Sequence, residues 1–183
     1  MGQLRSPTVS ARVSIRPLRL DDIERVTAIE VAAGQAFVDV GLPEVADDEP
    51  FTATTISSYA DDGRAWVVAD EQDAALAYIL VDIVDDAVHI EQVSVHPDAA
   101  RSGLGRALID HVAVWAAGRA GSALTLTTFR DVPWNAPYYE RLGFSVLEEA
   151  EIGVGLRAVR DHETAEGLDP SLRVCMRRDL TGA

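Results

Sequence analysis

Val93 to Leu108, the stretch VSVHPDAARSGLGRAL, decides the fold of this chain. It begins with β-branched residues typical of a strand, passes Pro97, and continues through Gly103 and Gly105 into an amphipathic run. The pattern predicts a strand, a short loop and a helix whose first N–H groups have no partner within the helix. Those groups and the positive end of the helix dipole favour an anion, and glycine lets a bulky anion approach the backbone. The segment therefore predicts a phosphate or pyrophosphate site.

Two common phosphate-binding motifs do not fit this stretch. A dinucleotide-binding fold has a third glycine in G-x-G-x-x-G, where this chain has Leu108. A P-loop needs Gly-Lys followed by Ser or Thr, and the sequence contains no lysine. The segment instead resembles the coenzyme A pyrophosphate loop of the GNAT superfamily of N-acetyltransferases, Gln/Arg-x-x-Gly-x-Gly/Ala. That motif falls on residues 100–105, with Ala100 in place of the usual Gln or Arg.

A second motif downstream strengthens this resemblance. Residues 135–144, NAPYYERLGF, are similar to the late helix of the family, in which a tyrosine is followed by x-Lys/Arg-x-Gly-Phe. Pro137 marks the start of this helix, Gly143 its left-handed end and Phe144 the next strand. The resemblance covers residues 12–149 and implies an α/β (α+β) fold. Its centre is a mixed, mostly antiparallel sheet of six to seven strands with helices on both faces.

Local patterns along the chain agree with such a fold. Runs rich in apolar and β-branched residues predict strands at 12–16, 64–69, 75–84, 87–95, 124–128 and 172–178. Helical spacing predicts helices at 21–33, 52–59, 103–118 and 156–166, with a loop containing some helix at 34–51. We expect a single acetyltransferase domain over residues 1–183, with a helical insertion near 150–170 before the last strand. The insertion is either a lid over the acceptor site or a surface segment.

Composition and charge limit the classes of function. The 183 residues carry a formal net charge of −14, and residues 21–90 hold 17 acidic residues against Arg25 and Arg64. A nucleic-acid-binding face needs clustered positive charge, so we expect no nucleic acid partner. No apolar run is long enough to cross a membrane, so no membrane partner is expected. The first ten residues lack the apolar core of a secretory signal, which together with the lone Cys175 predicts a cytoplasmic protein. The acidic segment either attracts a cationic acceptor or keeps the surface soluble.

The resemblance implies acetyl-CoA as co-substrate and direct attack of an amine on the thioester, with no enzyme nucleophile. The implied coenzyme-binding residues lie on the strand end, the loop and the late helix: Val93, Ser94, Val95, Arg101, Ser102, Gly103, Leu104, Gly105, Arg106 and Asn135. The backbone of 93–95 is expected to pair with the pantetheine arm as a further strand would. Asn135 is expected to cap the late helix. The histidines lack metal-ligand spacing, so no metal is expected.

Two residues are expected to move protons. By resemblance, Glu91 on the strand before the loop is the general base, although its place between Ile90 and Gln92 also fits a surface position. His89 is the rival base. Tyr139 matches the family tyrosine near the coenzyme sulfur and is expected to give a proton to the departing thiolate. A packing role is the alternative for this tyrosine.

The expected function is transfer of an acetyl group from acetyl-CoA to a primary amine of a small, cationic molecule. One alternative is a protein N-terminal or lysine acetyltransferase, which needs an open groove beside residues 34–51 and 150–170. A non-catalytic acyl-CoA-binding regulator is the other, and it would keep the phosphate loop without an acid–base pair. The sequence does not decide between a monomer and a homodimer.

Overall fold

The computed structural model describes residues 13–119 and 121–180, and within these ranges the strands form one mixed sheet in the order β1-β2-β3-β4-β5-β7-β6. The strands are β1 Ser14–Pro17, β2 Ala65–Ala69, β3 Ala75–Val84, β4 Ala87–Val95, β5 Ala123–Phe129, β6 Ser145–Val146 and β7 Arg173–Asp179. Neighbouring strands are antiparallel except β4 and β5, which are parallel. The predicted mixed, mostly antiparallel sheet is confirmed. Residue 12, where the first strand was expected to begin, lies outside the described residues.

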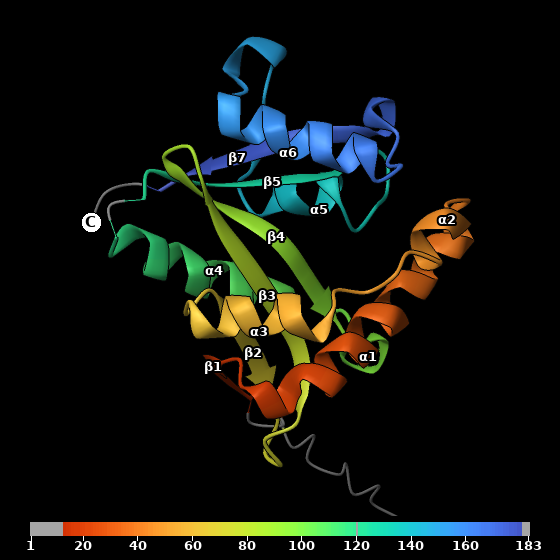
Figure 1. Ribbon diagram of the computed structural model, residues 1–183, viewed down its shortest axis with the longest axis vertical. Coiled ribbons are helices and arrows are strands. Elements are labelled where there is room, and N and C mark those ends of the chain that lie inside the picture. The colour runs from red at the N-terminus through yellow and green to blue at the C-terminus, as the bar shows by residue number, and fades with distance from the viewer. Residues whose placement is uncertain (1–12, 120, 181–183) are drawn as a thin grey trace, which may run out of the picture.

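Helices cover both faces of the sheet (Figure 1). They are α1 Ile23–Gly34, α2 Pro43–Ala46, α3 Ala53–Asp61, α4 Leu104–Ala117, α5 Ala136–Arg141 and α6 Val154–Ala165. Short 3-10 helices are η1 Leu20–Asp22, η2 Gln35–Val40, η3 Pro97–Ala99, η4 Glu149–Glu151 and η5 Pro170–Leu172. Figure 1 shows α1, α3 and α6 on the face toward the viewer and α4 behind the sheet. Residues 34–51, expected to be a loop containing some helix, contain η2 and α2.

Alternation along the strands divides the apolar core between the two faces. Trp66 and Val68 of β2 join the cluster that contains Leu108 of α4, whereas Val67 joins the cluster that contains Ile29 of α1. Successive side chains of a strand point to opposite faces, so one strand can serve both clusters. Full burial of an aliphatic side chain contributes about 1.5–3 kcal/mol, so these contacts fix the helices on the sheet.

Aspartates with positive φ lie in both hairpin turns of the central strands. Asp73, with φ of 64°, lies between β2 and β3, and Asp85, with φ of 53°, lies between β3 and β4. Aspartate enters the left-handed region more readily than most residues, because its short polar side chain can hydrogen bond locally. The strand bounds predicted at 75–84 and 87–95 are confirmed.

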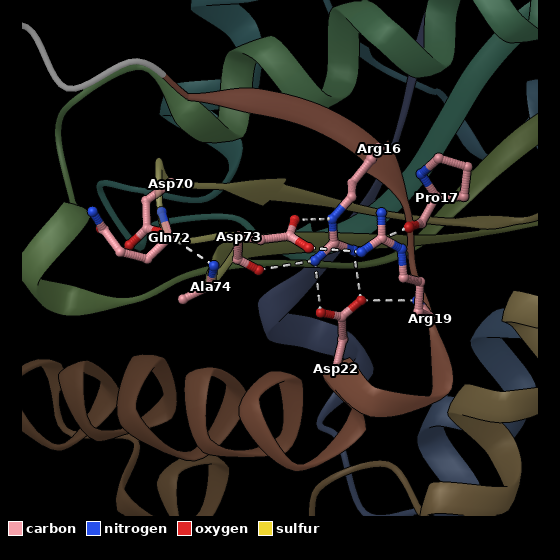
Figure 2. Close-up of polar contacts among 8 residues, drawn as sticks. All are labelled: Arg16, Pro17, Arg19, Asp22, Asp70, Gln72, Asp73 and Ala74. Carbon is pink, nitrogen blue, oxygen red and sulfur yellow. Dashed lines mark hydrogen bonds and ion pairs between the residues drawn. The ribbon is translucent and has the colours of Figure 1, made fainter.

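A charged network ties β1 to the start of α1 and to the β2–β3 turn (Figure 2). The Arg16 guanidinium donates to both carboxylate oxygens of Asp22, at 2.7 and 2.9 Å, and to Asp73 at 2.6 Å. Arg19 also donates to Asp73, at 2.7 Å. Burial by itself would raise the pKa of Asp22, but the hydrogen bonds from Arg16 and the Arg19 N–H outweigh it and lower that pKa. Two acids of the acidic segment are therefore compensated here.

Helix α6 lies within the region 150–170, and contacts fix it near both ends. Near its amino terminus, the N–H groups of Gly155 and Leu156 donate to the Asp85 carboxylate, at 2.8 and 3.2 Å. A carboxylate is favourable there because the helix dipole is positive. In its last turns, Glu163 hydrogen bonds to Arg173. Helix α6 is therefore bound to the sheet at the β3–β4 turn and at β7.

Candidate active site

β4 and β5 separate toward their carboxyl ends. Their parallel pairing comprises two residue pairs, of which His89–Thr125 is the last. Within the described residues, the edge of 93–95 that faces β5 therefore has no strand partner, while the other edge pairs with 77–79 of β3. Figure 1 shows the two strands diverging, with α2 on the same side of the molecule. An unpaired strand edge offers N–H and C=O groups to an extended ligand.

The loop after β4 has the backbone of an anion cradle. Arg101 and Gly103 have positive φ values of 60° and 85°, and α4 then begins without a side-chain cap. The first backbone bond closing the helix runs from the Ala107 N–H to the Gly103 carbonyl, at 3.0 Å. The N–H groups of the first turn precede that bond and make no intrahelical one, which suits a pyrophosphate.

The side chains of this loop differ in what they can contribute. Leu104 is buried in the core, so only its N–H faces a ligand. Ser102 donates its hydroxyl hydrogen to the Ala99 carbonyl, which stabilises the loop itself. Arg101 and Arg106 are exposed beside the cradle. The backbone and these two guanidinium groups are therefore the parts of the loop that suit a phosphate.

Gly105 lies against side chains of the protein itself, whereas the sequence predicted only that glycine lets an anion approach the backbone. A Cβ at this position would lie 3.3 Å from the Tyr138 hydroxyl and 3.7 Å from Cγ2 of Val95. The steric demand at Gly105 thus comes from α5 and β4. Gly103 has open space around the same position, and its positive φ is what favours glycine there.

Asn135 does not use its side chain to cap α5, so that prediction is wrong. It occupies the N-cap position, but its side-chain amide donates to Oγ1 of Thr128 at 2.6 Å. Its Oδ1 is buried and has no hydrogen-bond partner within the described residues. An unpaired buried acceptor costs about 1–3 kcal/mol. The pantetheine arm of coenzyme A carries amide N–H groups, which are donors of the kind that this acceptor lacks, so the residues present fit coenzyme A.

Glu91 lies in a β-bulge. Gln92 pairs with Leu80 of β3 and Ile90 pairs with Val81, so Glu91 between them has no opposite residue. A bulge redirects a side chain and locally breaks the ladder, and bulges are frequent beside active sites. The simple alternation expected from the sequence therefore does not describe this position. The Glu91 side chain is 31% exposed, neither on the open surface nor in the core.

Electrostatics favour Glu91 over His89 as a base. Burial, followed by the carboxylates of Asp82 and Glu163, raises the pKa of Glu91 to about 7. His89 is buried, with Nδ1 3.1 Å from Oγ1 of Thr125, and burial lowers the pKa of its ring to about 4. A base is most effective when its pKa lies near the working pH, so Glu91 suits the role better.

Tyr139 projects from α5 with a protonated hydroxyl. Its ring contacts those of Tyr138 and Phe144 edge-on, with centroids 5.4 and 5.8 Å apart. Burial raises the pKa of Tyr139, and nearby Arg173 opposes this. No described residue hydrogen bonds to the hydroxyl, so it is available as a proton donor.

The structure adds charged residues that the sequence analysis missed. Arg173 of β7 donates to both carboxylate oxygens of Glu163, at 2.7 and 3.2 Å, and to Oγ1 of Thr127 at 3.1 Å. Thr127 in turn donates to Glu163. The sequence carries one signal for this cluster, the threonines that alternate with leucines in the buried run 124–128. It does not identify the partners of those threonines.

Aromatic contacts join η2 to the end of β5 and to the segment that follows it. Phe37 in η2 lies 5.6 Å from the ring of Phe129 at the end of β5, and 5.7 Å from Trp134. The Arg173 guanidinium lies 4.9 Å from the centre of the Phe129 ring. Region 34–51 therefore reaches across to the β5–α5 connection.

Comparison with known proteins identifies the family. The model of the acetyltransferase (GNAT) family matches residues 31–144. The chain therefore belongs to this family and is an acetyl-CoA-dependent N-acetyltransferase.

Solved structures share the fold at low sequence identity. The ribosomal-protein-S18-alanine N-acetyltransferase from Escherichia coli is 20% identical, with a TM-score of 0.64 over 94% of this chain and 96% of its own. The N-acetylglutamate synthase from Neisseria gonorrhoeae, solved with coenzyme A and N-acetyl-glutamate, is 18% identical, with a TM-score of 0.70 over 94% of this chain and 36% of its own. The PaiA N-acetyltransferase from Thermoplasma acidophilum, in complex with coenzyme A, is 14% identical, with a TM-score of 0.59 over 92% of this chain and 99% of its own. This likeness shows the fold and does not select an acceptor.

In residues 13–119 and 121–180, no helix is long and apolar enough to span a membrane. The same ranges contain no group of three or more His, Cys, Asp or Glu side chains arranged to hold a metal ion.

Proposed function

We propose that this acetyltransferase acts on the primary amine of a small, cationic molecule. The observation that carries the proposal is an acidic rim formed by Glu44, Asp47, Asp48 and Glu166, which brings together the region of α2 and the end of α6. Burial, and then the charges of the other three acids, raise the pKa of Asp48. None of the four forms an ion pair with a described residue. Uncompensated acids attract and concentrate a cation.

The aromatic contact between η2 and the end of β5 supports a small acceptor. A peptide substrate needs an open groove between region 34–51 and the insertion. Phe37 instead reaches Phe129 and Trp134, and α6 is held by Asp85 and Arg173. The contacts of η2 on one side and of α6 on the other narrow the approach to the acceptor site.

The coenzyme-binding part of the proposal rests on backbone groups. Acetyl-CoA supplies the acetyl group as a thioester. The free edge of 93–95 aligns the pantetheine arm, and an N–H of this edge polarises the thioester carbonyl. The Gly103 loop and the start of α4 hold the pyrophosphate, assisted by Arg101 and Arg106. Asn135 accepts an amide hydrogen from the arm.

Glu91 and Tyr139 provide the proton transfers. The carboxylate of Glu91 accepts a proton from the acceptor amine, directly or through water, as the new N–C bond forms. The hydroxyl of Tyr139 gives its proton to the sulfur as the C–S bond breaks. Arg173 lies within electrostatic range of both residues, which supports their acting in one region.

A thiol-release assay with acetyl-CoA tests this function. The acceptors are a short diamine, an amino alcohol of the same length, a peptide with a free N-terminus and a peptide with an internal lysine. We expect the highest kcat/KM with the diamine. A higher kcat/KM with either peptide would contradict the small-molecule assignment. Coenzyme binding by calorimetry without turnover of any acceptor would indicate a regulator.

A further inference from the structure

We propose that Glu163 of α6 is a positioning residue of this enzyme, because its fixed carboxylate faces Glu91 across the diverging strands and strengthens Glu91 as a base. The proposal rests on the proposed role of Glu91. In this proposal, α6 supplies a fixed charge to the site and does not act as a lid over it.

Strand pairing and two side-chain contacts place the Glu91 and Glu163 carboxylates on one face of the sheet, at the diverging strands. His89 and Thr125 are the last paired residues of parallel strands β4 and β5. Glu91 follows His89 in the bulge, and its Oε2 lies 3.9 Å from Nε2 of His89, so the two side chains lie on the same face. Thr127 lies two residues after Thr125 and shares its face of the sheet. Thr127 donates a hydrogen bond to Glu163, so this carboxylate lies above that face of the sheet on the β5 side, as Glu91 does on the β4 side.

Glu163 cannot readily turn away from this position. Arg173 holds both of its oxygens, and the side chains of Arg173 and Glu163 are only 12% and 19% exposed. A two-point contact between guanidinium and carboxylate fixes orientation as well as distance. The Arg173 guanidinium also packs on Phe129, and Asp85 anchors the other end of the helix.

Charged and titratable groups reach Glu91 from five elements. They are Tyr59 of α3, Asp82 of β3, His89 of β4, His162 and Glu163 of α6, and Arg173 of β7. The Asp82 and Glu163 carboxylates favour the protonated form of Glu91, and His162 and Arg173 oppose it. Asp82 is paired with Arg64 and accepts a hydrogen bond from Tyr59 at 2.7 Å. Glu163 and Arg173 are bonded to each other yet act on Glu91 with opposite signs.

The first test measures the Glu91 carboxyl directly. The carboxyl carbon is titrated by 13C NMR in the full chain without substrate, and its signal is assigned from its loss in Glu91→Gln. Glu163→Gln keeps the shape and hydrogen-bonding capacity of the side chain and removes the charge. We expect it to lower the pKa of Glu91 by about half a unit, the size of one charge acting through a partly screened medium. Asp161→Asn, the same change of charge on the exposed side of α6, should leave it unchanged.

The second test uses the opposite sign of Arg173. Arg173→Gln should raise the pKa of Glu91, whereas loss of a merely structural contact would not produce shifts of opposite sign in the two variants. The acid limb of kcat/KM should move with the carboxyl, to lower pH in Glu163→Gln and to higher pH in Arg173→Gln. An unchanged carboxyl titration in folded Glu163→Gln would overturn the proposal. A shifted titration with an unshifted kcat/KM profile would instead remove Glu91 from the role of base and so contradict the proposed mechanism.

Discussion

Burial of Glu91 suits its proposed role as base and has a cost for the folded state. Its pKa is raised from 4.5 to about 7, so the folded protein binds a proton there more tightly than the unfolded chain does. The penalty is absent below about pH 4.5, grows between the two values, and is complete above about pH 7.

The variant Glu91→Gln tests this cost. It should be more stable than the unchanged protein at pH 8.5, by about 1–2 kcal/mol after allowance for solvent screening of a partly exposed side chain. The gain should shrink at pH 5.5, where less of the carboxyl is ionised in the folded state. Thermal unfolding at the two pH values measures it. An equal gain in stability at both pH values would show that the gain does not come from ionisation of the Glu91 carboxyl.

Tyr139 can be tested by removing a single atom. Tyr139→Phe keeps the ring contacts with Tyr138 and Phe144 and loses the proton donor. We expect kcat to fall about 10²- to 10⁴-fold with acetyl-CoA affinity nearly unchanged. Steady-state kinetics and calorimetry measure the two quantities, and Tyr138→Phe on the same helix is the comparison. An equal, small effect of the two substitutions would leave Tyr139 with a packing role.

At the scale of elements, the start of α4 meets α5 at one close contact. Alanine is normally better than glycine within a helix by about 0.5–1 kcal/mol, but a Cβ at Gly105 would crowd the Tyr138 hydroxyl at 3.3 Å. In Gly105→Ala, crowding against the Tyr138 hydroxyl therefore offsets the stability that alanine would add through its helix propensity.

A double-mutant cycle isolates this contact. Gly105→Ala should be more favourable to stability in the Tyr138→Phe background than in the unchanged protein, by about 0.5–1 kcal/mol. Urea unfolding of the four proteins gives the coupling. Equal effects of Gly105→Ala in both backgrounds would mean that the two helices do not press on each other there.

The docking of α6 on the β3–β4 turn depends on a second glycine. A Cβ at Gly155 would lie 2.8 Å from Oδ1 of Asp85 and 3.0 Å from Cγ1 of Val84. We expect Gly155→Ala to destabilise the protein by about 1–3 kcal/mol. Asp85→Gly removes the clashing carboxylate and suits the positive φ, so the cost of Gly155→Ala should be smaller in that background. Thermal unfolding compares them, and an undiminished cost would place the clash elsewhere.

At the scale of the whole molecule, some acids are paired with arginines and the rim acids are not. Arg16, Arg19 and Arg64 pair with acids around β1, the β2–β3 turn and α3. The rim acids at α2 and the end of α6 form no described ion pair. The acids bound by these arginines are thus compensated, whereas the rim acids are not.

This difference in pairing predicts a salt effect that depends on the acceptor. The kcat/KM for a diamine should fall about 3- to 10-fold as ionic strength rises from about 0.02 to 0.5 M, because salt screens the rim. The amino alcohol of the same length should respond less, and Asp48→Asn should weaken the response to the diamine. Initial rates across the salt series measure it. Equal slopes for both acceptors would mean that the rim serves solubility.

The sequence by itself determined the parts of this protein that depend on neighbouring residues. The bounds of β3 and β4, the aspartates in their turns and the loop leading into α4 follow from alternation, turn chemistry and glycine, all of which act over a few residues. The family motifs at 100–105 and 135–144 are equally local. These patterns were sufficient for the sheet, the coenzyme and the choice of Glu91 and Tyr139 as candidates.

Only the tertiary structure decided the surroundings of these groups. It turned the Asn135 amide toward Thr128, set Tyr138 against Gly105, and brought Glu163 and Arg173 to Glu91. Thr127 and Glu163 are 36 positions apart in the chain. No local pattern encodes such a pairing, because it arises when α6 packs on the sheet and the helix and two strands bring their side chains to one place.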